Sequence, residues 1–176
     1  RFVARMAELG YAPYTTALAV HYPEPIAGEG RPEGRIDTKA DNLMKLFELR
    51  DTRFPAVEVW NTEEGLWGEG RHQKDAALSA RDLPKIYVTQ IAAGVDRIFW
   101  FAMKGDNLAY LLRPAGNISE PAISYAEMTR QLEGAAFVGY HSPEKGIRQY
   151  LFANAGKPVI VAWSNIGEKT IELFAG

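Results

Sequence analysis

The chain has 176 residues, of which 47% are hydrophobic and 24% charged, a composition ordinary for a globular protein. Its 20 basic and 22 acidic residues are scattered and give a formal net charge of -2, so neither nucleic acid nor a membrane surface is an expected partner. The lack of cysteine excludes disulfides and thiolate nucleophiles, and the three histidines lack metal-ligand spacing, so no metal or cofactor is predicted.

The pattern of apolar residues predicts a short amphipathic segment and then three strand, loop and helix repeats. The amphipathic segment covers residues 2–9, and the expected strands are residues 15–20, 56–63 and 97–101. The expected helices begin near Asp37-Thr38, at Asp82-Leu83-Pro84 and at Ser119, the last running to Leu132. Each long loop follows a strand, so the pattern predicts a parallel sheet whose working face lies at the carboxyl ends of the strands.

The second strand is the most informative, because an apolar run ends in two carboxylates. Side chains alternate along a strand, so Val57, Val59, Asn61 and Glu63 are expected to share one face. Glu63 would then lie at the carboxyl end of its strand, where α/β enzymes place catalytic groups. The simpler alternative is a solvated acidic pair at a strand end.

We expect a barrel in preference to an open sheet, because residues 28–31 and 68–71 lack the glycine spacing of a phosphate loop. Beyond Gly134 the apolar pattern changes to period two. Short antiparallel strands are predicted at residues 136–141, 147–154, 157–164 and 169–174, with Ala155-Gly156 as a hairpin turn. The predicted domains are therefore residues 1–134 and 135–176.

Several motifs occur in an order that resembles the clan A retaining glycoside hydrolases. Leu18-Ala-Val-His-Tyr22 is similar to the end of their sixth barrel strand, and Val59-Trp-Asn-Thr-Glu-Glu-Gly65 to their seventh. Gly94-Val-Asp-Arg-Ile-Phe-Trp-Phe101 resembles the eighth strand, and Val159-Ile-Val-Ala-Trp163 resembles a β-sandwich appended after the barrel. The resemblance implies an α/β fold: strands 6 to 8 of a (β/α)8 barrel followed by a partial antiparallel β-sandwich.

By position in these motifs, the resemblance implies that Glu63 is the nucleophile of a double displacement on a carbohydrate substrate. Trp100 is the expected platform for a sugar ring, although an ordinary buried tryptophan is the alternative. Tyr22 is expected to orient the nucleophile while His21 contacts a sugar hydroxyl, although either residue could hold the key position, and a packed pair without function is equally compatible.

Trp67 and Asn61 complete the predicted substrate-binding set, with Asn61 as support for Glu63. Trp67 is expected to form the floor of a neighbouring subsite, although a loop tryptophan packed on its own scaffold is equally compatible. An extracellular or periplasmic location is implied by the resemblance alone, and the oligomeric state is open.

The chain begins at Arg1 and three strands cannot close a barrel, so we expect a carboxyl-terminal fragment that is inactive by itself. The acid/base glutamate of the family is expected upstream of Arg1. Two other functions are considered: a degenerate barrel that binds carbohydrate without chemistry, and a scaffold domain in which the aromatic residues are core.

Overall fold

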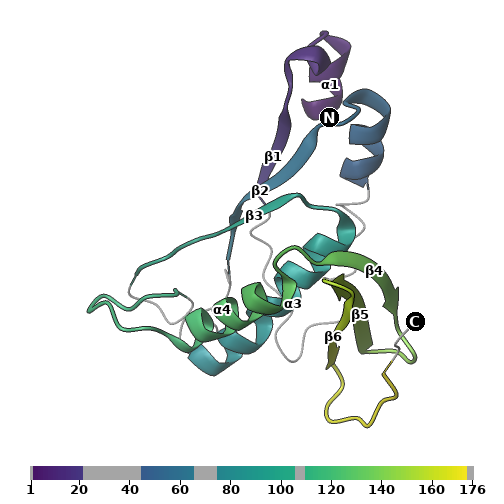
Figure 1. The fold of residues 1–176 in the computed structure, drawn as a ribbon. Coiled ribbons are helices and arrows are strands. Elements are labelled where there is room, and N and C mark those ends of the chain that lie inside the picture. Colours follow the sequence, from purple (N-terminus) through teal and green to yellow (C-terminus); the bar gives the residue numbers. More distant parts are fainter. Residues whose placement is uncertain (1, 22–44, 66–74, 106–109, 174–176) are drawn as a thin grey trace.

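The computed structural model describes residues 2–21, 45–65, 75–105 and 110–173, and Figure 1 shows their arrangement. It is mixed α/β, with one parallel and one antiparallel three-stranded sheet. The elements before the first crossover are α1 (Phe2–Glu8), η1 (Ala12–Tyr14) and β1 (Ala17–His21). The crossover from β1 to β2 contains a helix over residues 45–53. The elements that follow are β2 (Glu58–Glu64), α3 (Ala76–Ala93), β3 (Arg97–Trp100), α4 (Glu120–Leu132), β4 (Ala136–His141), β5 (Ile147–Asn154) and β6 (Lys157–Ser164).

The first sheet is parallel in the order β1-β2-β3, as the strand, loop and helix pattern predicts. β2 begins at Glu58 rather than at residue 56, because Ala56 has a φ of 67°, a left-handed conformation that cannot continue a strand. The helix predicted after Asp37-Thr38 is present over residues 45–53, and its expected cap lies outside the described residues.

The helices cover one face of the parallel sheet. Val59 of β2 is fully buried and packs with Phe47 from the helix over residues 45–53. Ile98 of β3 contacts the same cluster and also the cluster of α3 and α4. Because these apolar side chains lie on one face, the alternate side chains of each strand project from the other. The sheet therefore has a helix face and a face that the described helices leave uncovered.

α3 begins earlier than the sequence predicts. Its first residue is Ala76, and the Asp75 carboxylate caps it by accepting a hydrogen bond from the Leu78 N–H at 2.9 Å. Pro84 therefore lies inside the helix and not in its first turn. A proline there cannot donate to the carbonyl oxygen of Ala80, and the Ser124 hydroxyl of α4 donates to that oxygen instead, at 2.6 Å.

The second sheet is antiparallel in the order β4-β5-β6, and its three strands have the predicted bounds. Ala155 and Gly156 join β5 to β6 with φ angles of 49° and 78°, the two left-handed positions of a type I′ turn. One face of β5 packs on α3, where Tyr150 and Phe152 contact Val88. The second sheet thus shares a hydrophobic cluster with the helix that follows β2.

The fourth antiparallel strand, predicted at residues 169–174, is wrong for the residues that the structure describes, since none of residues 165–173 forms a strand. The Glu172 carbonyl oxygen accepts a hydrogen bond from the Gln149 side chain at 2.8 Å. Gln149 lies in the central strand of its sheet, so its side chain projects from a face and not from an edge. This contact holds residue 172 over a face of the sheet, so the segment does not pair with an edge strand.

We predict that Ser124→Ala costs about 1 kcal/mol of unfolding free energy, because the Ala80 carbonyl oxygen loses its hydrogen-bond donor. In a Pro84→Ala background the new N–H at residue 84 can serve that oxygen, so Ser124→Ala should cost less than about half as much there. Urea unfolding of the four proteins of this double-mutant cycle measures both costs. Equal costs in the two backgrounds would show that Ser124 does not substitute for the missing N–H.

Candidate functional site

The candidate site is the uncovered face of the parallel sheet, which carries His21 and Glu63 at the carboxyl ends of β1 and β2 and Arg97 at the first residue of β3. We call it the open face and define it by His21, Trp60, Glu63, Arg97 and Phe99. Val20, Val59 and Ile98, which neighbour these residues along the strands, pack against the helix layer, so alternation places the open-face residues opposite. The carboxyl end of a parallel strand is also the end at which α/β proteins present functional groups.

Glu63 and His21 lie together on the open face. Nδ1 of His21 is 3.4 Å from Oε2 of Glu63, and the two residues are paired in the register of β1 and β2. Glu63 retains 32% of its side-chain exposure, and His21 retains 60%. The carboxylate is therefore accessible to a ligand and has a histidine beside it that can hold its orientation. The predicted contact of His21 with a sugar hydroxyl stays a prediction, and the structure adds its contact with the Glu63 carboxylate.

The expected grouping of Glu63 with Val59 and Asn61 on one face is wrong. The register of β2 shifts against both neighbours between Asn61 and Glu64, so an extra residue interrupts the alternation. As a result Glu64 lies on the helix face with Val59 and Asn61, and both Glu64 and Asn61 are fully buried. Glu63 is left on the open face with His21.

Asn61 supports the strand end through its side-chain amide. Its Oδ1 accepts a hydrogen bond from the Glu63 N–H at 3.3 Å. Its Nδ2 donates to Oε2 of Glu64 and to Oε1 of Gln90, both at 2.8 Å. Asn61 therefore holds the backbone beneath Glu63, while its side chain lies in the helix layer.

Trp100 lies on the helix face of the sheet, whereas Glu63 lies on the open face. The Trp100 ring lies 6.1 Å from that of Tyr87, and it packs with the cluster of α3 and α4 on the helix face. The indole N–H is buried and makes no hydrogen bond with the described residues. Phe101 follows it and remains 44% exposed, so Phe101 and Phe99 are the exposed aromatic residues of this segment.

Trp60, Arg97 and Phe99 of the open face form a connected group with Glu58. The Trp60 Nε1–H donates to Oε2 of Glu58 at 2.6 Å, and the Arg97 Nε–H donates to the same oxygen at 3.3 Å. These hydrogen bonds, that of Trp60 first, lower the pKa of Glu58. The Arg97 guanidinium lies 5.0 Å from the Trp60 ring centroid, and the Phe99 ring lies 6.1 Å from it. The group presents flat aromatic surface and a fixed cation on the open face.

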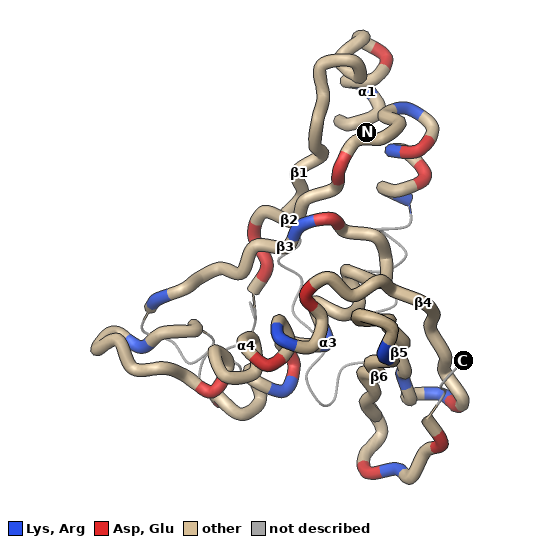
Figure 2. Tube along the Cα trace, viewed as in Figure 1, with Lys and Arg blue, Asp and Glu red and all other residues tan. Residues whose placement is uncertain are grey.

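Tyr22 and Trp67, the two other predicted binding residues, lie outside the described residues. Within the described ranges no group of three or more His, Asp or Glu residues could hold a metal ion. Figure 2 shows acidic and basic residues interspersed along the same ranges. No helix in the described part of the chain is long and apolar enough to cross a bilayer.

Glu64 and Gln90 are parts of the site that the sequence pattern did not predict. Gln90 Nε2 donates to Oε2 of Glu64 at 2.5 Å, and Gln90 is itself buried. A signal for Gln90 was present, because it continues the helical spacing of the buried residues Leu83, Ile86 and Tyr87. A polar residue in such a stripe requires a buried partner.

Two comparisons with known proteins return no match. A scan against protein-family models finds none for this chain, and a search of curated proteins finds none either. The family resemblance therefore stays a prediction.

Tyr87 yields a prediction about the helix side of the site. Burial, with Tyr125 and Glu64 nearby, raises the pKa of its phenol well above the ordinary value. The stabilisation from the neutral phenol is complete below about pH 10, the unfolded pKa, and is lost as the pH rises above it. The unfolding free energy of the wild type should then fall by up to about 1.4 kcal/mol per pH unit more steeply than that of Tyr87→Phe. Urea unfolding between pH 8 and 12 tests this, and parallel curves would contradict it.

Proposed function

We propose that this chain provides the nucleophile side of a retaining glycoside hydrolase site, built on strand and helix units of a (β/α)8 barrel. The observation that carries the proposal is the position of Glu63. It is an accessible carboxylate at the carboxyl end of a parallel strand, on the face opposite the helices and 3.4 Å from a histidine. Exposed aromatic residues nearby, of which Phe99 is 47% exposed, suit the C–H face of a sugar ring.

In the proposed first step, an oxygen of Glu63 attacks the anomeric carbon from the side opposite the leaving group. The bond from the anomeric carbon to the leaving oxygen breaks with its electron pair, and a general acid gives that oxygen a proton. In the second step, water attacks the same carbon, its proton goes to the conjugate base, and the ester bond to Glu63 breaks. The ionised carboxylate stabilises the positive charge that develops on the ring in both steps.

His21 would keep the carboxylate turned toward the open face. Asn61 would hold the Glu63 backbone through the bond from its N–H. A retaining site requires a second carboxylate about 5 Å from the nucleophile. The partners of Glu63 in the described part of the chain are His21 and Asn61, neither of which is a carboxylate. The proposal assigns the general acid to none of the described residues.

The test is covalent labelling of the full-length native protein by 2,4-dinitrophenyl 2-deoxy-2-fluoroglycosides of xylose, glucose and mannose. Dinitrophenolate leaves without protonation, so the first step can be observed independently of the general acid. We expect one sugar on the peptide that contains Glu63, detected by mass spectrometry. Glu63→Gln should abolish labelling and lower turnover by several orders of magnitude.

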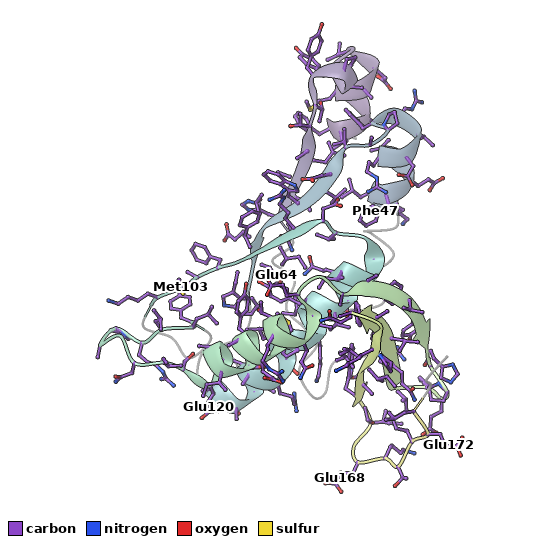
Figure 3. The ribbon with its side chains drawn as sticks, in the orientation of Figure 1. Phe47, Glu64, Met103, Glu120, Glu168 and Glu172 are labelled. Carbon is purple, nitrogen blue, oxygen red and sulfur yellow. The ribbon has the colours of Figure 1, made fainter. Side chains whose placement is uncertain are left out.

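Glu168→Gln is the matched control, because Glu168 is an exposed residue beyond β6, well apart from β2 (Figure 3). It should label as the wild type does. Attachment of the sugar to any residue other than Glu63 would overturn the assignment.

A non-catalytic carbohydrate-binding role is the second candidate, and the exposed aromatic surface of Phe99 and Phe101 favours it. It predicts sugar binding without labelling, with an affinity that Glu63→Gln leaves intact. A scaffold role predicts no sugar binding at all.

A further inference from the structure

Glu64 is a fully buried carboxylate next to the proposed nucleophile. It lies at the end of β2 on the side of the sheet toward α3, as Figure 3 shows, whereas Glu63 lies on the open face. A carboxylate removed from water is costly unless hydrogen-bond donors replace its hydration. The hydrogen bonds that Glu64 accepts offset that cost, and their arrangement indicates what the residue does.

The directions of these hydrogen bonds follow from a single backbone group. The Glu63 N–H can only donate, so the atom of Asn61 that it contacts must be the oxygen. The Asn61 nitrogen therefore faces Glu64 and Gln90 and donates to both. Gln90 accepts with its oxygen, so its own nitrogen is left to donate to Oε2 of Glu64.

The other oxygen of Glu64 also faces a donor, since Oε1 accepts from the Gly65 N–H at 3.1 Å. Both oxygens of Glu64 are thus acceptors, which is the arrangement that an ionised carboxylate provides and an amide cannot. The Glu64 carbonyl oxygen in turn accepts from the Phe101 N–H, which ties β2 to the end of β3. Glu64 is fixed through its side chain and its backbone together.

This network of hydrogen bonds stabilises the irregular end of β2. The register shift between Asn61 and Glu64 turns their side chains to the same face, where they hydrogen-bond to each other. With both held in the helix layer, the intervening Glu63 is turned to the open face beside His21. Without the bond to Glu64, ordinary alternation would return Glu63 to the face of Asn61.

We propose that Glu64 is a positioning residue, whose buried carboxylate holds the end of β2 in the bulged form that presents Glu63 to substrate. This inference deepens the proposed function and rests on it, because it takes Glu63 to be the residue that meets a substrate. The geometric part, that Glu64 sets the backbone at Glu63 and Gly65, can be tested without any activity.

The geometric test is amide hydrogen exchange by NMR on Glu64→Gln. One atom of the new amide is a donor facing donors, so exchange at the amides of residues 63 and 65 should accelerate at least about tenfold. Glu63→Gln is the matched control, because it makes the same change one residue away on the accessible face. It should leave both rates within about threefold of the wild type.

Gln90→Leu is the second variant, in case Glu64→Gln fails to fold. It removes the donor to Glu64 from the helix side and should accelerate the same two amides. Unchanged exchange in the folded variant or variants, or equal acceleration in Glu63→Gln, would overturn the inference whatever the protein does with sugars.

The catalytic test uses the rate of dinitrophenolate release from the fluoroglycoside. We expect Glu64→Gln to lower the maximal rate about tenfold or more while the half-saturating concentration stays within about twofold, because the substrate contacts of the open face remain. A rise of about tenfold in the half-saturating concentration with an unchanged maximal rate would overturn the positioning role. Accelerated exchange in Glu64→Gln, together with a wild type that carries no label on Glu63, would refute the proposed function and leave the Glu64 network in place.

Discussion

The contact on which the candidate site depends is the hydrogen bond between the buried side chains of Asn61 and Glu64. It joins residues three apart on a strand, which regular alternation would place on opposite faces. That contact requires the register shift at the end of β2, and the shift turns Glu63 toward His21. One buried acid and one accessible acid therefore follow each other in sequence with separate surroundings.

The helix layer stabilises this arrangement from behind. Gln90 of α3 lies within hydrogen-bond distance of both Asn61 and Glu64, so the position of α3 sets the network. α3 is in turn held on two other sides, by α4 through Leu83 and Met128, and by the antiparallel sheet through Val88. This three-sided packing explains why α3 buries polar residues such as Gln90 as well as apolar ones.

The two faces of the parallel sheet have different chemistry. The helix face carries apolar clusters with one polar network at the strand ends, where Trp100 and Tyr87 pack nearby. The open face carries a carboxylate with a histidine, and an arginine over a tryptophan ring. Aromatic and charged side chains on one surface are suited to a polar ligand with an apolar face, which a pyranose is.

The sequence by itself determined those elements whose signals are local. The strands β4, β5 and β6 have a period of two and a type I′ turn, and α4 has its Ser119 cap, so their bounds were predicted from residues close to one another. The position of an acid at the end of β2 was predicted in the same way. These features depend on backbone preferences that neighbouring residues set.

Only the tertiary structure decided which of the two acids faces the ligand side. A slip of one residue turns every later side chain to the other face, and the register of β2 is set by β1, β3 and Gln90, the last 26 residues from Glu64. The start of α3 was mispredicted for the same reason, since Ser124 serves the carbonyl that Pro84 leaves open, from 44 residues beyond Ala80. Contacts between residues far apart in the chain carry no local pattern, and they set the face of Glu63 and the packing of Trp100 on the helix layer.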